Sequence, residues 1–190
     1  MQSPLDVLSQ VVRALDATGI AYVVVGSFAS SLHGVYRATA DIDIVADMKP
    51  EHVAPLVSVL QASFYVDEQA VARAVARHGS FNAIHLDSIF KVDIFTPLPG
   101  GFGRQQLARR RREQITPDAA RSIYVATAED TILSKLLWYD AGGRVSQAQW
   151  ADVSGIVRAQ GARLDVEYLR EWAARFGVGE LLEQALAPES

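Results

Sequence analysis

The sequence predicts a mixed α/β fold, with an α/β domain over residues 1–126 and a helical region over residues 127–190 that packs on it. Three observations support this. Short apolar runs rich in β-branched residues alternate with helical patterns before residue 126. After residue 127 every apolar pattern has helical spacing. The 190 residues, 49% of them hydrophobic, suffice for one domain with a helical addition.

The first elements are expected to be a helix, a buried strand and a short helix. Ser3 and Pro4 predict the start of the first helix, as a capping residue followed by proline in the first turn. Residues 22–25 are apolar on both faces and mostly β-branched, which predicts a central strand. The Gly-Ser pair at 26–27 ends that strand, and residues 28–33 follow as a helix.

The remaining elements follow from the same patterns and from glycine and proline positions. A tight turn at residues 87–88 should join two strands, and the loop at 97–101 should lead into an arginine-rich helix. The expected strands are 42–45, 81–86, 89–95 and 122–125, and the other expected helices are 50–60, 67–77, 127–141, 146–159, 165–176 and 179–187.

Two carboxylates stand two residues apart on the strand predicted around residue 42. Because side chains alternate along a strand, Asp41 and Asp43 should project from one face while Ile42 and Ile44 enter the core. Two acids held this close repel each other unless a cation lies between them. Mg²⁺ suits such a place, since it takes one or two carboxylates together with phosphate oxygens of a substrate.

A third carboxylate, Asp93, stands on the strand predicted over residues 89–95, where Val92 and Ile94 should face the core. On an adjacent strand it would complete the cluster, as a metal ligand or as the base for an attacking hydroxyl. The alternative is that these acids are solvated residues at strand ends. Their large apolar neighbours favour a functional role, because such surroundings are unfavourable for a charge.

The glycine-serine turn is the second candidate feature. Gly26 allows the backbone to approach a ligand closely, and Ser27 can offer its hydroxyl and the N–H groups of a helix start to a phosphate. Taken alone, the same pattern is found in many connections from a strand to a helix. Followed after thirteen residues by Asp-Ile-Asp-Ile and later by another strand acid, it becomes much more specific.

This combination resembles the DNA polymerase β-like nucleotidyltransferase superfamily, with Val25-Gly26-Ser27, then Asp41-Ile42-Asp43-Ile44, and Asp93 in the position of the third acid. Residues 37–43 are similar to the bacterial branch that contains the AbiEii-type toxins. Residues 128–136 and 142–153 resemble that branch's helical segments. The resemblance implies a minimal nucleotidyltransferase fold with a small mixed sheet, followed by a helical bundle.

The resemblance also implies site residues and ligands. Asp41, Asp43 and Asp93 would bind two Mg²⁺ or Mn²⁺ ions. Lys135 would contribute to catalysis and grip the triphosphate, and Asp152 would orient that lysine or act as a further base. One segment departs from the toxin pattern, because residues 149–150 read Gln-Trp where a Lys-Asp pair is usual. The alternatives for Lys135 and Asp152 are a lysine that snorkels at the core boundary and a solvated helix acid.

Arginines provide further candidate contacts. Arg37 precedes Asp41 by four residues and could reach a phosphate, although loop arginines are more often solvated. A cluster without acidic residues could form a basic helix face that holds RNA, or simply a solvated face; it contains Arg104, Arg109, Arg110, Arg111 and Arg112.

Composition narrows the function further. The net charge of −4 argues against a general polyanion binder, and the lack of cysteine excludes thiolate chemistry. No signal peptide or membrane-spanning run is visible, so a soluble, cytoplasmic protein is expected. The sequence therefore predicts a nucleotidyltransferase that moves a nucleoside monophosphate to an unknown acceptor, with an antitoxin as a candidate partner. A catalytically silent nucleotide-binding or interaction module is the alternative.

Overall fold

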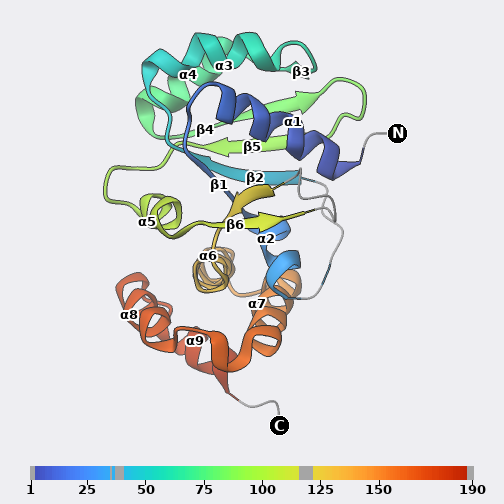
Figure 1. The fold of residues 1–190 in the computed structure, drawn as a ribbon. Helices are drawn as coiled ribbons and strands as arrows, with labels where there is room; N and C mark the ends of the chain where they lie inside the picture. Colours follow the sequence, from blue (N-terminus) through green and yellow to red (C-terminus); the bar gives the residue numbers. More distant parts are fainter. Residues whose placement is uncertain (1–2, 35, 37–40, 116–121, 188–190) are drawn as a thin grey trace. The chain divides into compact units, whose positions relative to one another are not determined.

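The computed structural model describes residues 3–34, 36, 41–115 and 122–187, and Figure 1 shows its fold. The chain divides into two compact units. Unit 1 comprises Met1–Val25 and Thr39–Ala126, and unit 2 comprises Gly26–Ala38 and Thr127–Ser190. One boundary between the units falls between residues 126 and 127, and the segment 26–38 is grouped with the helices of unit 2.

In its described residues, unit 1 contains a seven-stranded mixed sheet with the strand order β3-β4-β5-β2-β1-β7-β6. The parallel neighbours are β2 with β5 and β1 with β7, and the other neighbours are antiparallel. The strands are β1 (Tyr22–Val25), β2 (Asp41–Ala46), β3 (Phe64–Tyr65), β4 (Ser80–His85), β5 (Lys91–Phe95), β6 (Arg111–Gln114) and β7 (Ser122–Val125).

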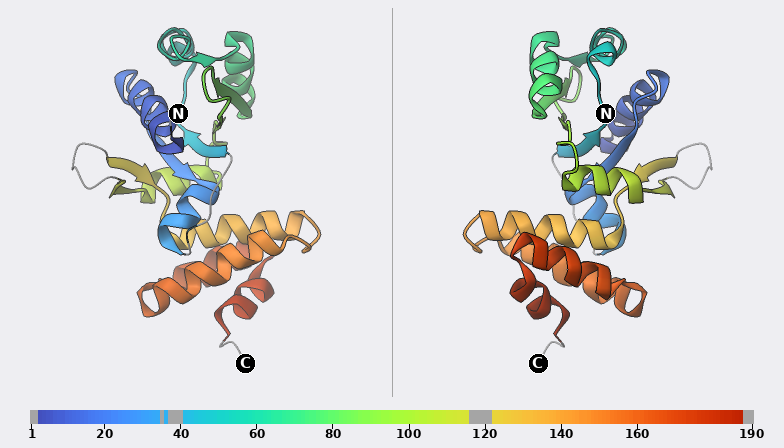
Figure 2. Two further views of the ribbon diagram at one scale, coloured as in Figure 1. Left: turned by 90° about the vertical axis from the view of Figure 1, so that its right-hand side faces the viewer. Right: turned by 90° about the vertical axis from the view of Figure 1, so that its left-hand side faces the viewer.

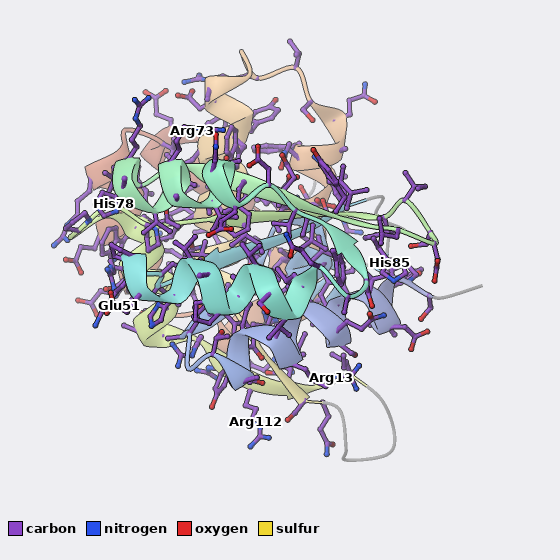
Figure 3. All side chains as sticks on the ribbon, turned by 90° about the horizontal axis from the view of Figure 1, so that it is seen from above. Arg13, Glu51, Arg73, His78, His85 and Arg112 are labelled. Carbon is purple, nitrogen blue, oxygen red and sulfur yellow. The ribbon has the colours of Figure 1, made fainter. Side chains whose placement is uncertain are left out.

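Three helices cover one face of this sheet: α1 (Pro4–Ala17), α3 (Val53–Leu60) and α4 (Glu68–Arg77). Viewed from above, α3 lies between α1 and α4, which carries Arg73 (Figure 3). A 3₁₀ turn, η1 (Pro50–His52), precedes α3. Beneath the helices, alternate strand residues form the fully buried core; among them are Val24, Ile42, Ile44, Val92 and Ile94.

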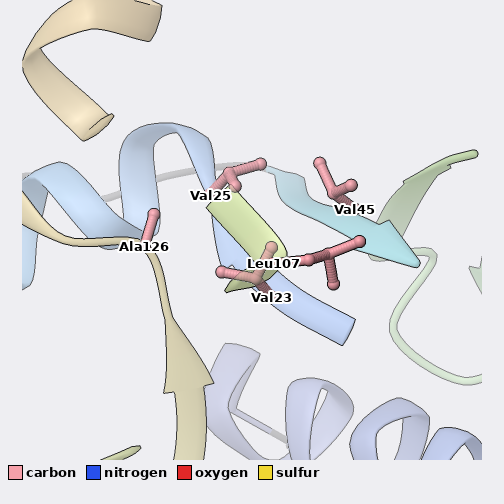
Figure 4. Packing of buried hydrophobic residues seen from close by; sticks show 5 residues of the cluster. All are labelled: Val23, Val25, Val45, Leu107 and Ala126. Atoms are coloured by element: carbon pink, nitrogen blue, oxygen red, sulfur yellow. The ribbon is translucent and has the colours of Figure 1, made fainter. Parts of the chain in front are cut away.

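Helix α5 (Phe102–Arg109) packs on the opposite face of the sheet, against β1 and β2. There Leu107 contacts Val45 and a small cluster completed by Val23, Val25 and Ala126 (Figure 4). The rest of this face, on β2 and β5, carries polar side chains. The two sides of β2 are thus chemically different, because Ile42 and Ile44 face the core under the helices and Asp41 and Asp43 face the other way.

Unit 2 is helical, consisting of α2 (Gly26–His33), α6 (Ala128–Ala141), α7 (Gln147–Gln160), the 3₁₀ turn η2 (Gly161–Arg163), α8 (Val166–Phe176) and α9 (Gly179–Leu186). Helices α6 and α7 lie side by side in both views of Figure 2. Helix α2 contacts both of them, α8 packs on α6, and α9 packs on α7 and α8. Across the described segments, no helix has the length and apolarity needed to cross a bilayer.

The predicted fold class is confirmed: a mixed sheet with helices is followed by a helical bundle. The arginine-rich helix was predicted too long. Helix α5 ends at Arg109, the backbone of Arg110 leaves the helical region (φ −52°, ψ 144°), and Arg111 and Arg112 lie in β6. The reason is tertiary, because this segment pairs in antiparallel fashion with β7, and ladder hydrogen bonds outweigh the helix propensity of arginine.

The contact between α2 and α7 gives a first prediction. A Cβ added to Gly34 would lie 2.9 Å from the backbone nitrogen of Ile156 and 3.0 Å from the carbonyl carbon of Gly155. Because backbone atoms yield less than a flexible side chain, Gly34→Ala should lower the free energy of unfolding by about 1–3 kcal/mol in urea titrations.

The matched control is Gly179→Ala in the first turn of α9. Its added Cβ meets no described atom within 4 Å, so stability should be unchanged or slightly higher. Equal losses in the two variants would contradict a close approach of backbone at Gly34.

Candidate functional site

The three predicted acids of unit 1 lie on one face of the sheet, on two adjacent strands. Asp41 and Asp43 are on β2, and Asp93 is on β5, where it is the register partner of Asp43. Each acid is half-buried, whereas Ile42 and Ile44 between and beside them are fully buried. Parallel neighbours lie about 4.8 Å apart, so the register holds Asp43 and Asp93 side by side.

A lysine lies among these acids. Lys91 is two residues before Asp93 on β5 and is the register partner of Asp41 on β2. Its Nζ forms an ion pair with Oδ2 of Asp93 at 2.7 Å. The hydrogen bond to Asp93 raises the pKa of Lys91 above its ordinary value, and the negative charges of Asp41 and Asp43 act in the same direction. The cluster therefore contains a cation of its own.

The other oxygen of Asp93 is held from the opposite side. Asn82 on β4 is the antiparallel partner of Asp93, and its Nδ2 donates a hydrogen bond to Oδ1 of that carboxylate. Both oxygens of Asp93 thus have a partner, one neutral and one charged. Sequence reasoning missed both residues. Lys91 could have been found because it stands two residues before Asp93, the same spacing that relates Asp41 and Asp43. Asn82 could have been found by pairing the two strands that the predicted turn at residues 87–88 joins.

Carboxylate oxygens are the ligands that Mg²⁺ prefers, so the residue types on this face are those of a magnesium site. Among the described residues, no three His, Cys, Asp or Glu side chains are gathered closely enough to hold a metal. The metal-ligand roles of Asp41, Asp43 and Asp93 therefore stay a prediction.

In unit 2, the structure brings together three other predicted residues. Lys135 on α6 is buried, and its Nζ lies 2.7 Å from Oδ2 of Asp152 on α7. The same ammonium donates a hydrogen bond to Oγ of Ser27 on α2 at 3.2 Å. The side chains of Lys135 and Asp152 are only 5% and 7% exposed, so neither is a solvated residue at the core boundary.

Local sequence fixes this arrangement. Gly26 has a φ of +65°, a conformation that favours glycine, so β1 can end and α2 begin within one residue. Thr127 caps α6 by accepting the N–H of Asp130, and Ser146 caps α7 by accepting the N–H of Gln149. These caps set where the two helices start and therefore which residues face each other. Arg37, the remaining predicted phosphate contact, lies outside the described residues.

The arginines of the proposed basic face do not share one helix side. Arg104 forms an ion pair with Asp47, and the guanidinium of Arg110 lies 4.6 Å from the centre of the Tyr124 ring. Arg112 on β6 donates a hydrogen bond to Ser122. A basic helix face was therefore the wrong geometry for this cluster, and RNA contact by these residues stays a prediction.

Comparison with solved structures identifies the fold. The chain resembles the antibiotic-resistance factor ANT(2″)-Ia in its solution structure (16% identity, TM-score 0.59), covering 95% of this chain and 96% of that one. The crystal structure of ANT(2″)-Ia with adenylyl-2″-tobramycin gives 17% identity and a TM-score of 0.58, covering 93% and 98% of the respective chains.

A third similar structure is an antigenic nucleotidyltransferase-like protein from Paracoccidioides brasiliensis, with 15% identity, a TM-score of 0.54 and coverage of 96% of this chain and 91% of that one. No family model and no curated protein sequence matches the chain. At these identities the likeness shows the fold alone, which is that of nucleotidyltransferases.

The buried ion pair of unit 2 gives the second prediction. Asp152→Asn leaves the ammonium of Lys135 buried without its counter-charge, which should lower the free energy of unfolding by about 3–5 kcal/mol. The double variant Lys135→Met with Asp152→Leu should recover most of that loss, because it removes both charges.

The control is the exposed pair of Asp140 and Arg144 in the same unit, whose side chains are 39% and 51% exposed. Asp140→Asn should cost less than about 1 kcal/mol. Chemical denaturation measures all of these variants. If Asp152→Asn cost no more than Asp140→Asn, the pair would not be the buried contact described.

Proposed function

We propose that this chain is a metal-dependent nucleotidyltransferase of the DNA polymerase β-like superfamily, moving a nucleoside monophosphate from a nucleoside triphosphate to an acceptor hydroxyl. The observation that carries the proposal is the register of β2 and β5, which sets Asp43 beside Asp93 and puts Asp41 on the same face. The nucleotidyltransferase fold supports it.

In this proposal Asp41, Asp43 and Asp93 hold Mg²⁺ or Mn²⁺, and two ions are expected. When bound, such ions neutralise the triphosphate and the charge that develops during transfer. The neighbouring core residues Ile42 and Ile44 hold β2 in place. Rigid placement matters because catalysis of phosphoryl transfer depends mainly on positioning and electrostatics.

The reaction is an in-line substitution at the α-phosphorus. The acceptor oxygen forms a bond to that phosphorus, the bond to the oxygen bridging the α- and β-phosphates breaks, and pyrophosphate leaves. The proton of the acceptor hydroxyl passes to a base, for which Asp93 is the candidate.

For phosphate binding in unit 2 we propose Gly26, Ser27 and Lys135. Asp152 and Ser27 take two of the three N–H donors of the Lys135 ammonium in the part of the chain that the structure describes, which leaves one donor for a phosphate oxygen. Asp152 then acts as a positioning residue, since it fixes the ammonium whose charge it balances. Arg37 is proposed as an additional phosphate contact.

The acceptor is proposed to be RNA, a protein hydroxyl or a small molecule. ANT(2″)-Ia was solved in complex with adenylyl-2″-tobramycin, so amino sugars such as tobramycin should be among the acceptors that are tested. Membership of the AbiEii-type branch, and with it an antitoxin partner, is the finer form of the proposal and rests on residues 37–43 and 128–153 of the sequence.

The third prediction tests the transfer itself. With an α-labelled nucleoside triphosphate, Mg²⁺ or Mn²⁺, and a panel of RNA, protein and amino sugars, the protein should label one acceptor class and release pyrophosphate. Asp43→Asn should reduce labelling at least about 100-fold, because a carboxylate that holds the metal ions of the reaction is lost.

The matched control is Asp87→Asn, an exposed carboxylate of the same unit in the turn between β4 and β5. It should keep full activity. Labelling that survives Asp43→Asn would overturn the assignment. Metal-dependent nucleotide binding without transfer to any acceptor would favour a silent nucleotide-binding module instead.

A further inference from the structure

Lys91 is the unexpected member of the acidic face. It carries a positive charge on the face that also holds three carboxylates, and the register between β2 and β5 puts it opposite Asp41 while Asp93 lies opposite Asp43. Side chains two residues apart on a strand share a face, so Lys91 and Asp93 point the same way. The Nζ–Oδ2 distance of 2.7 Å is that of a charge-assisted hydrogen bond.

We propose that Lys91 is a built-in counter-cation that competes with divalent metal for this cluster, so that metal binding is an exchange in which the lysine leaves Asp93. This inference rests on the proposed function, because it concerns the metal site assigned there. It adds a residue that regulates occupancy of that site.

Coulombic repulsion explains why the two cations compete. A divalent ion bound by Asp93 would bring a second positive charge beside the ammonium of Lys91, and like charges so near each other repel strongly wherever water is partly excluded. Only 14% of the Asp93 side chain is exposed, so screening by solvent is incomplete there. The ammonium of Lys91 and a divalent ion therefore cannot both stay bound to Asp93.

The geometry makes Lys91 the group that moves. Its side chain is 45% exposed, so its flexible stem can carry the ammonium into solvent at low cost. Asp93 does not need to turn, because Asn82 holds its Oδ1 from β4. The exchange therefore takes place at Oδ2 alone, and the carboxylate keeps its orientation before and after it.

The arrangement has a second consequence, for the metal-free protein. Three neighbouring carboxylates repel one another, and the ion pair of Lys91 with Asp93 offsets part of that repulsion. Removing the lysine should therefore destabilise the metal-free protein and, at the same time, strengthen metal binding. Removing a surface lysine with a purely structural role would lower stability without strengthening metal binding.

The fourth prediction compares Lys91→Gln with the wild type in metal-free buffer and in Mg²⁺ or Mn²⁺, without nucleotide. The apparent Mn²⁺ affinity by calorimetry should rise about three- to tenfold, the range expected when a half-exposed ion pair no longer has to be broken. The metal-induced rise in melting temperature should be larger in the variant than in the wild type. Lys91→Arg, which keeps the charge, should stay within about twofold of the wild type.

The control is Lys49→Gln, an exposed lysine of the same unit outside the cluster, which should bind Mn²⁺ as the wild type does. Equal or weaker metal binding in Lys91→Gln overturns the exchange. Asp43→Asn separates the two proposals. Metal binding that is lost in Asp43→Asn but not strengthened in Lys91→Gln upholds the metal site and rejects the role of Lys91. Binding that Asp43→Asn leaves unchanged rejects the metal site itself, and the exchange with it.

Discussion

The parallel register between β2 and β5 is the constraint on which the acidic face of unit 1 depends. It sets Asp41 opposite Lys91 and Asp43 opposite Asp93, and it sends Ile42, Ile44 and their neighbours on β5 into the core. A shift of one residue would send the carboxylates into the apolar layer, where an unpaired charge is very costly. The same core burial that stabilises the sheet therefore fixes the acids.

The lysine–aspartate pairs of the two units differ in how far they are buried. On the sheet, Asp93 is mostly buried, but its cation, Lys91, is on a side chain that is 45% exposed. In the helical unit, Lys135 and Asp152 are both almost fully buried, and the pair is fixed by capped helices. An exchangeable pair suits a site that must accept a ligand cation, whereas a fixed pair suits a group that holds a hydroxyl such as that of Ser27 in place.

The features of the fold and of the site that depend on local sequence pattern could be predicted from the sequence. Alternation along β2 was enough to place Asp41 and Asp43 on the side away from Ile42, and the Thr127 cap fixed where α6 begins. The parts that depend on pairing between distant segments could not. Lys91 becomes significant only when the neighbour of β5 is known, and the strand at Arg111 exists only because β7 is there to receive it.

We propose that Asp41, Asp43 and Asp93 form one metal-binding face. Paramagnetic Mn²⁺ titrated into ¹⁵N-labelled protein tests it most directly, since the ion broadens amide signals close to where it binds. Signals of residues 41–43 and 91–93 should disappear first, and they should persist in Asp43→Asn. Broadening centred elsewhere, or unchanged by that substitution, would contradict it.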